Sequence, residues 1–141
     1  MNGKPLSCAE CGAALPGSLS CRDMLAEVIG WESEDGELLT EHFKTVASFN
    51  LQHPSCFRDD AMAKLRTAFI DHLDRGLAPS AIRKSMAFFF KGSAKVLKDD
   101  PEGPIALRRW KLTISDVYAG GDSCGAAGRV RRWAASVRSE L

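Results

Sequence analysis

Apolar residues recur at intervals of three and four along most of this 141-residue chain, in separate runs that end at glycine or proline. In the clearest run, Met62, Leu65, Phe69 and Leu73 form one stripe, charged residues cover the other face, and Gly76 ends the run. This spacing is typical of amphipathic helices, and no run shows the strict alternation of a half-buried strand. The periodicity therefore predicts an all-α fold.

Five or six helices account for these runs, in a bundle. The start and stop signals place them at residues 21–30, 40–53, 58–75, 79–92, 113–119 and 126–141. Residues 31–40 are acidic and predict an exposed loop, and residues 98–104 predict a turn-rich connector. Residues 105–112 fit either a short helix or an extended segment.

The first 20 residues contain three Gly and two Pro and show no helical period, so they need another source of order. Cys8 and Cys11 have the two-residue spacing that lets both thiolates reach one tetrahedral ion, and Gly12 permits the positive φ of such a knuckle. Cys21 lies at a predicted helix start, where the helix dipole favours a thiolate. The pattern predicts a zinc (Zn2+) knuckle with three sulfur ligands.

The fourth ligand has five candidates, which are His42, His53, Cys56, His72 and Cys124. If the first two predicted helices form an antiparallel hairpin, His53 comes near Cys21. His42 lies eleven residues earlier, about 16 Å away along an intact helix, which is too far to share the ion. His53 is thus the predicted ligand. Cys56, just past the turn at Pro54, remains the main alternative, and His42 also stays open.

Three thiolates and one imidazole make a closed shell, which is typical of structural zinc. The sequence therefore predicts a small zinc-binding helical protein that acts through protein–protein interaction or regulation. A zinc-dependent hydrolase is an alternative, and it needs an open coordination position and a base such as Glu10, Glu27 or Glu41. The usual hydrolase and deaminase motifs, His-Glu-x-x-His and His-x-Glu with Pro-Cys-x-x-Cys, are absent.

The net charge is only +1, which excludes a strongly basic nucleic-acid module on composition alone. Residues 1–54 carry three basic and eight acidic groups, whereas residues 55–98 carry nine and four. This polarity favours an oppositely charged protein partner or self-association. A second alternative is a nucleic-acid-binding regulator. Its basic groups would be Arg108, Arg109, Lys111, Arg129, Arg131, Arg132 and Arg138, with Trp110 and Trp133 between them, although a solvated helix face is the commoner meaning of such clusters.

The N-terminus lacks the apolar stretch of a secretory signal, and the most apolar window, residues 86–90, is far short of a membrane span. We therefore expect a cytoplasmic protein without a membrane segment. Its five cysteines, an odd number, suit metal binding better than a disulfide framework in that compartment. We expect one domain over residues 1–141, with residues 1–20 as the knuckle and 21–141 as the helical body.

Several of these residues together resemble a family of small, uncharacterised bacterial proteins. The shared features are Cys8-x-x-Cys11-Gly12, Cys21 before a helix, His42, Val46, Leu51-Gln52-His53-Pro54, and the C-terminal residues Trp133-Ala134 and Ser136-Val137. The chain departs from the family pattern at Ala9, where Pro is expected, and at Phe49, where Tyr is commoner. Neither position is a predicted ligand. The resemblance implies no activity, since the family is a domain of unknown function.

Overall fold

Seven α-helices and one short 3-10 turn form most of the part of the chain that the structure describes. The structure is a computed structural model that describes residues 6–89 and 105–141. The helices are α1 (Cys21–Trp31), α2 (Gly36–Thr40), α3 (His42–Gln52), α4 (Asp59–Arg75), α5 (Pro79–Phe89), α6 (Ile114–Tyr118) and α7 (Ala126–Ser139), and the 3-10 turn η1 is Pro54–Cys56. These residues contain no strand, so the predicted all-α class is confirmed.

The additional helix is α2, where the acidic composition predicted an exposed loop. It occupies Gly36–Thr40, and the Asp35 side chain caps it by accepting a hydrogen bond from the Leu38 amide at 3.1 Å. Leu38 is completely buried, whereas Leu39 is 55% exposed. A helix of five residues is too short to show a 3.6-residue period, which explains why the loop prediction was wrong here.

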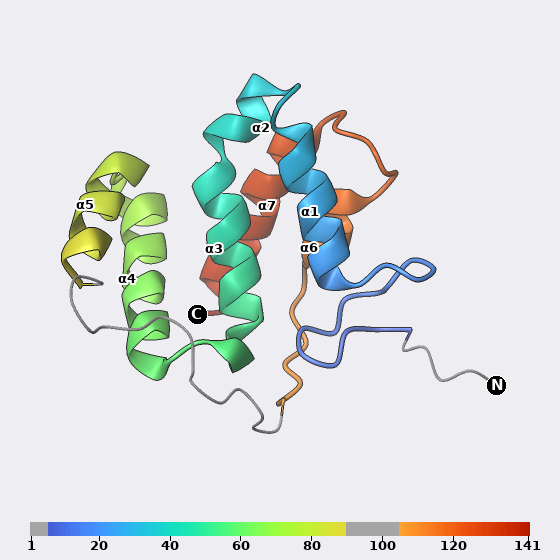
Figure 1. The fold of residues 1–141 in the computed structure, drawn as a ribbon, viewed down its shortest axis with the longest axis horizontal. Coiled ribbons are helices and arrows are strands. Elements are labelled where there is room, and N and C mark those ends of the chain that lie inside the picture. Colours follow the sequence, from blue (N-terminus) through green and yellow to red (C-terminus); the bar gives the residue numbers. More distant parts are fainter. Residues whose placement is uncertain (1–5, 90–104) are drawn as a thin grey trace.

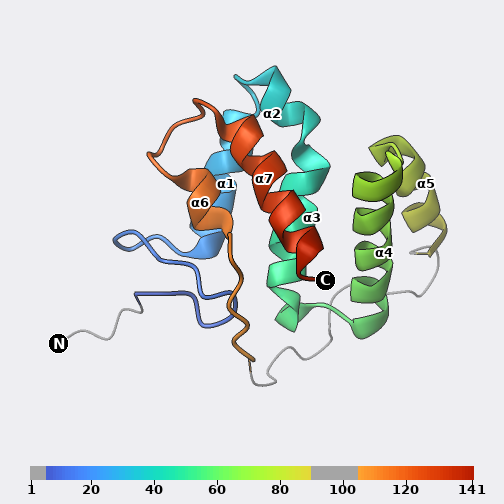
Figure 2. The same ribbon diagram turned by 180° about the vertical axis from the view of Figure 1, so that it is seen from behind.

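Helix α3 lies in the middle of the molecule, with α4 and α5 on one side and α1, α6 and α7 on the other (Figures 1 and 2). It packs against α4 on one side and against α7 on the other, while α1 packs against α6. The predicted apolar face of α7 forms much of the core, with Val130, Trp133 and Val137 fully buried. Residues from all these helices except α5 join one hydrophobic cluster. The same cluster includes Leu51 near the end of α3 and Cys11 and Ala13 of the N-terminal segment.

Local sequence signals set several helix ends. Ser20 and Asp23 form a reciprocal capping box at the start of α1, and Thr113 and Asp116 form the predicted one at α6. Gly76 ends α4 with φ of 69°. The predicted end of the fourth helix near Gly92 and the connector at 98–104 lie outside the described residues.

Residues 105–112 are an irregular, non-helical segment. Its amides bond to the N-terminal knuckle, from Arg108 to the Glu10 carbonyl at 2.9 Å and from Trp110 to the Cys11 carbonyl at 3.5 Å. The helical alternative for this segment is therefore wrong. Among the described residues, no helix has both the length and the apolar composition that crossing a bilayer requires.

Candidate metal centre

The N-terminal segment is ordered by a small hairpin. The Cys8 amide donates to the Ala13 carbonyl at 2.8 Å, and the Gly12 amide donates back to the Cys8 carbonyl at 3.0 Å. Gly12 has φ of +80°, and a Cβ there would lie 3.3 Å from Cγ of Arg109. Glycine thus allows both the turn and the close approach of the 105–112 segment.

Cys8, Cys11, Cys21 and His53 come together in one group. Their sulfur and ring nitrogen atoms all lie within 4.8 Å of one another. The Sγ atoms of Cys11 and Cys21 are 3.6 Å apart, and Sγ of Cys8 is 3.8 Å from Nε2 of His53. Tetrahedral zinc with Zn–S near 2.3 Å and Zn–N near 2.0 Å implies about 3.8 Å between sulfurs and about 3.5 Å from sulfur to nitrogen. All the cysteines are free thiols, and the group can hold a metal ion.

The orientation of His53 is fixed by its other ring nitrogen. Nδ1 donates to the Phe49 carbonyl at 2.7 Å, and the Phe49 ring stacks on the imidazole at 4.1 Å between centroids. This hydrogen bond leaves Nε2 facing the sulfurs. A carbonyl partner of this kind is common behind metal-binding histidines.

The backbone supports negative charge on the sulfurs. The amides of Glu10 and Cys11 point at Sγ of Cys8, at 3.4 and 3.5 Å. Cys21 is the first residue of α1, where unpaired amides and the helix dipole favour a thiolate. Cys11 and Cys21 are buried, with 0% and 6% of their surface exposed. Sγ of Cys8 thus faces two backbone amides, and Cys21 lies buried at a helix start.

The side chains of the cluster shift one another's pKa values. The hydrogen bond from Cys21 lowers the pKa of the Cys11 thiol to about 4, against the opposing effect of burial. That same contact and burial raise the pKa of Cys21, since a second adjacent thiolate is unfavourable. Burial alone lowers the pKa of His53, but hydrogen bonds to Cys11 and to the Phe49 carbonyl outweigh it and raise the pKa to about 9.

Glu10 links the knuckle to the segment that follows His53. Its carboxylate accepts hydrogen bonds from the amide of Ser55 at 2.8 Å and from the hydroxyl of Ser55 at 3.0 Å. A pocket of about 340 Å³ lies at this junction, lined in part by Cys8, Cys21 and His53. Glu10, one of the predicted candidates for a catalytic base, thus joins the knuckle to η1.

The alternative fourth ligands are elsewhere. Cys56 is exposed and lines the pocket beside the cluster, but it does not belong to the group of mutually close ligand atoms. His42 lies at the other end of α3, where Nδ1 bonds to the Glu32 carboxylate at 2.7 Å. Nδ1 of His72 donates to the Leu77 carbonyl at 2.7 Å. Within the described residues, His53 is thus the histidine that joins the cysteines.

Gln52, which precedes His53, holds three segments together in the core. It is 1% exposed; its Oε1 accepts from the Trp133 indole at 3.2 Å, and its Nε2 donates to the Leu112 carbonyl at 2.8 Å. Neither this role nor that of Glu10 follows from the sequence pattern. No local signal reveals either contact, because the partners lie 45 to 81 positions away.

The basic clusters near the C-terminus are largely used within the chain. Trp110 is 9% exposed and Trp133 is fully buried, so neither ring is presented for stacking on a base. Four of the seven basic side chains bond to other parts of the protein. Arg108 bonds to the Glu140 carbonyl and covers Trp110, Arg129 bonds to the Val117, Asp122 and Cys124 carbonyls, Arg131 bonds to Glu37 and Glu41, and Arg138 bonds to Asp74.

The candidate metal centre lies within a region that a known protein family shares. A family model described as a family of unknown function, DUF5946, matches residues 6–141. The chain belongs to this family. The match includes all four clustered residues, and it confirms the expected membership of a domain of unknown function. Neither curated proteins nor solved structures gave a match to the chain.

Proposed function

We propose that Cys8, Cys11, Cys21 and His53 bind one structural zinc ion in a single-domain cytoplasmic protein that acts through protein–protein interaction or regulation. The observation that carries the proposal is the mutual approach of four ligand atoms within 4.8 Å, from segments 45 positions apart. A Cys3His set is a typical structural zinc shell. Zinc would supply the cross-link between the irregular knuckle and the helices.

Two features favour a structural over a catalytic ion. Four protein side chains complete a tetrahedral shell and leave no position for water or substrate. The three acidic candidates for a base are also poorly suited. Glu10 is bonded to Ser55, Glu41 is bonded to Lys44 and Arg131, and Glu27 is an exposed residue of α1.

The same closed shell argues for a role in recognition. A site that holds the fold leaves function to the surface, whose charge is polarised along the chain. Such polarity favours docking of a charged protein partner or of a second copy. The nucleic-acid alternative is disfavoured by the two buried tryptophans and by the internal bonds of the arginines.

Metal analysis of the purified protein tests the proposal. We expect about one zinc per chain and a marked fall in melting temperature after treatment with a strong chelator, reversed by added zinc. A triple Cys8, Cys11 and Cys21 to Ser variant should contain no zinc, whereas the Cys124→Ser control should retain it. Zinc-free protein that melts identically with and without chelator would overturn the proposal.

A further inference from the structure

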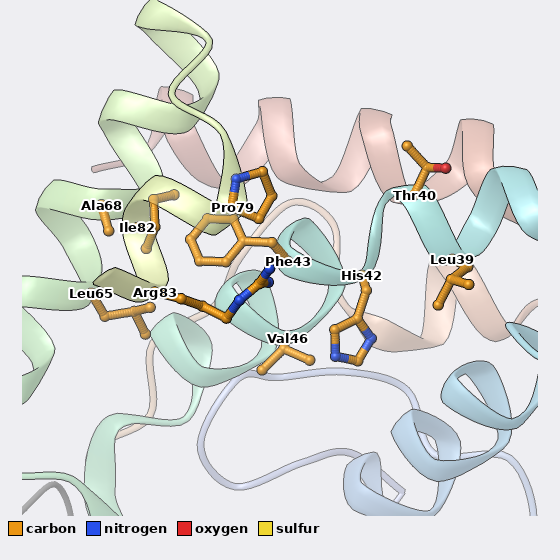
Figure 3. A pocket seen from close by; sticks show the side chains of 10 residues that line it. All are labelled: Leu39, Thr40, His42, Phe43, Val46, Leu65, Ala68, Pro79, Ile82 and Arg83. Atoms are coloured by element: carbon orange, nitrogen blue, oxygen red, sulfur yellow. The ribbon is translucent and has the colours of Figure 1, made fainter. Parts of the chain in front are cut away.

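A second pocket lies at the opposite end of α3 from the cysteine cluster, lined by residues of α2, α3, α4 and α5 (Figure 3). Its volume is about 460 Å³, within the usual range for small-molecule sites. Most of its lining is apolar. The apolar side chains include Leu39, Phe43, Val46, Leu65, Ala68 and Ile82.

The pocket has a buried floor and an open rim. Ala68 and Ile82 are buried, with 9% and 4% of their surface exposed, whereas Leu39 at the rim is 55% exposed. Apolar surface held open to water in a concavity is unfavourable. An apolar chain that displaces this water would gain free energy by burial on several sides.

The polar lining is basic rather than acidic. Arg83 from α5 lines the pocket, and none of the lining residues is Asp or Glu. Figure 3 shows Arg83 and His42 on either side of Val46 in this view. His42 is held by its Nδ1 bond to Glu32, but no ion pair joins Arg83 to an acidic group of the described residues. Arg83 is exposed, and its guanidinium has the charge and geometry to bind an anion.

We propose that this pocket binds a small amphipathic carboxylate, with its apolar chain between α3, α4 and α5 and its carboxylate on Arg83. One guanidinium matches one carboxylate in bidentate geometry. A nucleotide or sugar phosphate would need more polar donors than this apolar lining offers. The site is separate from the metal centre and does not depend on the proposed zinc.

The length of the pocket favours a small molecule over a peptide helix. Its contribution from α3 extends only from His42 to Val46, about one helical turn. A docked amphipathic helix presents anchors at i, i+3 or i+4 and i+7, over about two turns. The occupant that fits is a single flexible or compact apolar chain with one charged end.

Calorimetric titration of the full chain with decanoate, below its micelle concentration, tests the site. We expect one binding event per chain, weakened about tenfold by Arg83→Gln through loss of the charged hydrogen bonds. Lys84→Gln, which removes a neighbouring charge on α5 outside the pocket lining, should leave the affinity unchanged. Decanol should bind the unmodified chain about as weakly as decanoate binds the Arg83→Gln variant.

Methyl NMR locates the binding site in the same titration. The Ile82 methyl signals should shift on addition of decanoate, while those of Ile114, buried in the core with α6, should not. Ala68→Leu should narrow the pocket and abolish binding while thermal unfolding stays cooperative. Absence of binding, equal losses from Arg83→Gln and Lys84→Gln, or an unmoved Ile82 would each overturn the proposal.

Discussion

The Nδ1 nitrogen of His53 lies 2.7 Å from the backbone carbonyl oxygen of Phe49, one turn earlier in α3. Because the carbonyl can only accept, this nitrogen carries the proton and the other ring nitrogen faces Cys8. The helix itself thus selects the tautomer that can bind a metal. A ligand oriented in this way needs little rearrangement when an ion arrives.

Removing the imidazole should weaken zinc binding far more than removing the other histidine of α3. His53→Ala deletes one of four ligands, so we expect zinc affinity to fall by more than about 100-fold, which exceeds the usual effect of removing a hydrogen-bond partner behind a ligand. His42→Ala is the matched control, since His42 bonds to Glu32 at the far end of the helix. Competition with a chromogenic chelator measures both, and equal losses would contradict the His53 assignment.

Acidification should weaken zinc binding steeply. Against the effect of burial, hydrogen bonds to Cys11 and to the Phe49 carbonyl raise the pKa of His53 to about 9. Below that pH the imidazole must therefore lose a proton before it can bind the ion. The raised pKa of Cys21 adds a second proton to be displaced. We expect apparent affinity to fall at least about tenfold per pH unit between pH 8 and 6. A pH-independent affinity in a competition assay would contradict this.

Two buried polar residues of α3 should respond oppositely to substitution. Gln52→Leu leaves the Trp133 indole and the Leu112 carbonyl without their partner, so we expect a loss of about 2 to 4 kcal/mol in unfolding free energy. Ser48 is fully buried, and among the described residues its hydroxyl has no hydrogen-bond partner, so Ser48→Ala should be neutral or stabilising. Urea unfolding of both variants gives the comparison. A Gln52→Leu loss no larger than that of Ser48→Ala would remove the proposed role of Gln52.

Glu41 should stabilise the fold at neutral pH but not in acid. Burial alone raises the pKa of Glu41, but hydrogen bonds from Lys44 and Arg131 outweigh it and hold the pKa below its usual value. Its stabilisation is therefore present above the unfolded-state pKa near 4.5 and disappears as pH falls through the lower folded-state pKa. Glu41→Gln should cost about 1 to 2 kcal/mol at pH 7. In thermal melts the difference should shrink as pH is lowered below 4.5 and vanish once Glu41 is protonated in the folded state, whereas the exposed control Glu34→Gln should cost little at pH 7.

Most of the fold could be predicted because its helices carry local signals. The stripe of α4, its end at Gly76 and the capping box at Thr113 lie within a few residues of the positions they determine. Helix α2 was missed, since one turn has no measurable period. The irregular course of residues 105–112 was also undetermined, because its bonds go to the knuckle about 100 positions earlier.

The four clustered residues were predictable for a different reason. The spacing of Cys8 and Cys11 limits what the segment can do, and an antiparallel arrangement of two helices brings the end of α3 near Cys21. The supporting contacts could not be predicted, since Glu10 and Gln52 bond to residues fixed only by tertiary packing. The pocket beside Arg83 could not be predicted from the sequence either, because residues from four helices line it.

Cys8 and His53 lie far apart in the sequence, so a metal ion bound to both would restrict the unfolded chain. They are 45 positions apart, so an ion bound to both closes a loop of that length. In the chain-entropy description of a cross-link, closing such a loop destabilises the unfolded ensemble by about 4 kcal/mol. Unlike a disulfide, this closure needs no oxidant and breaks without reduction. The availability of metal would then set the topology of the chain reversibly, with every covalent bond intact.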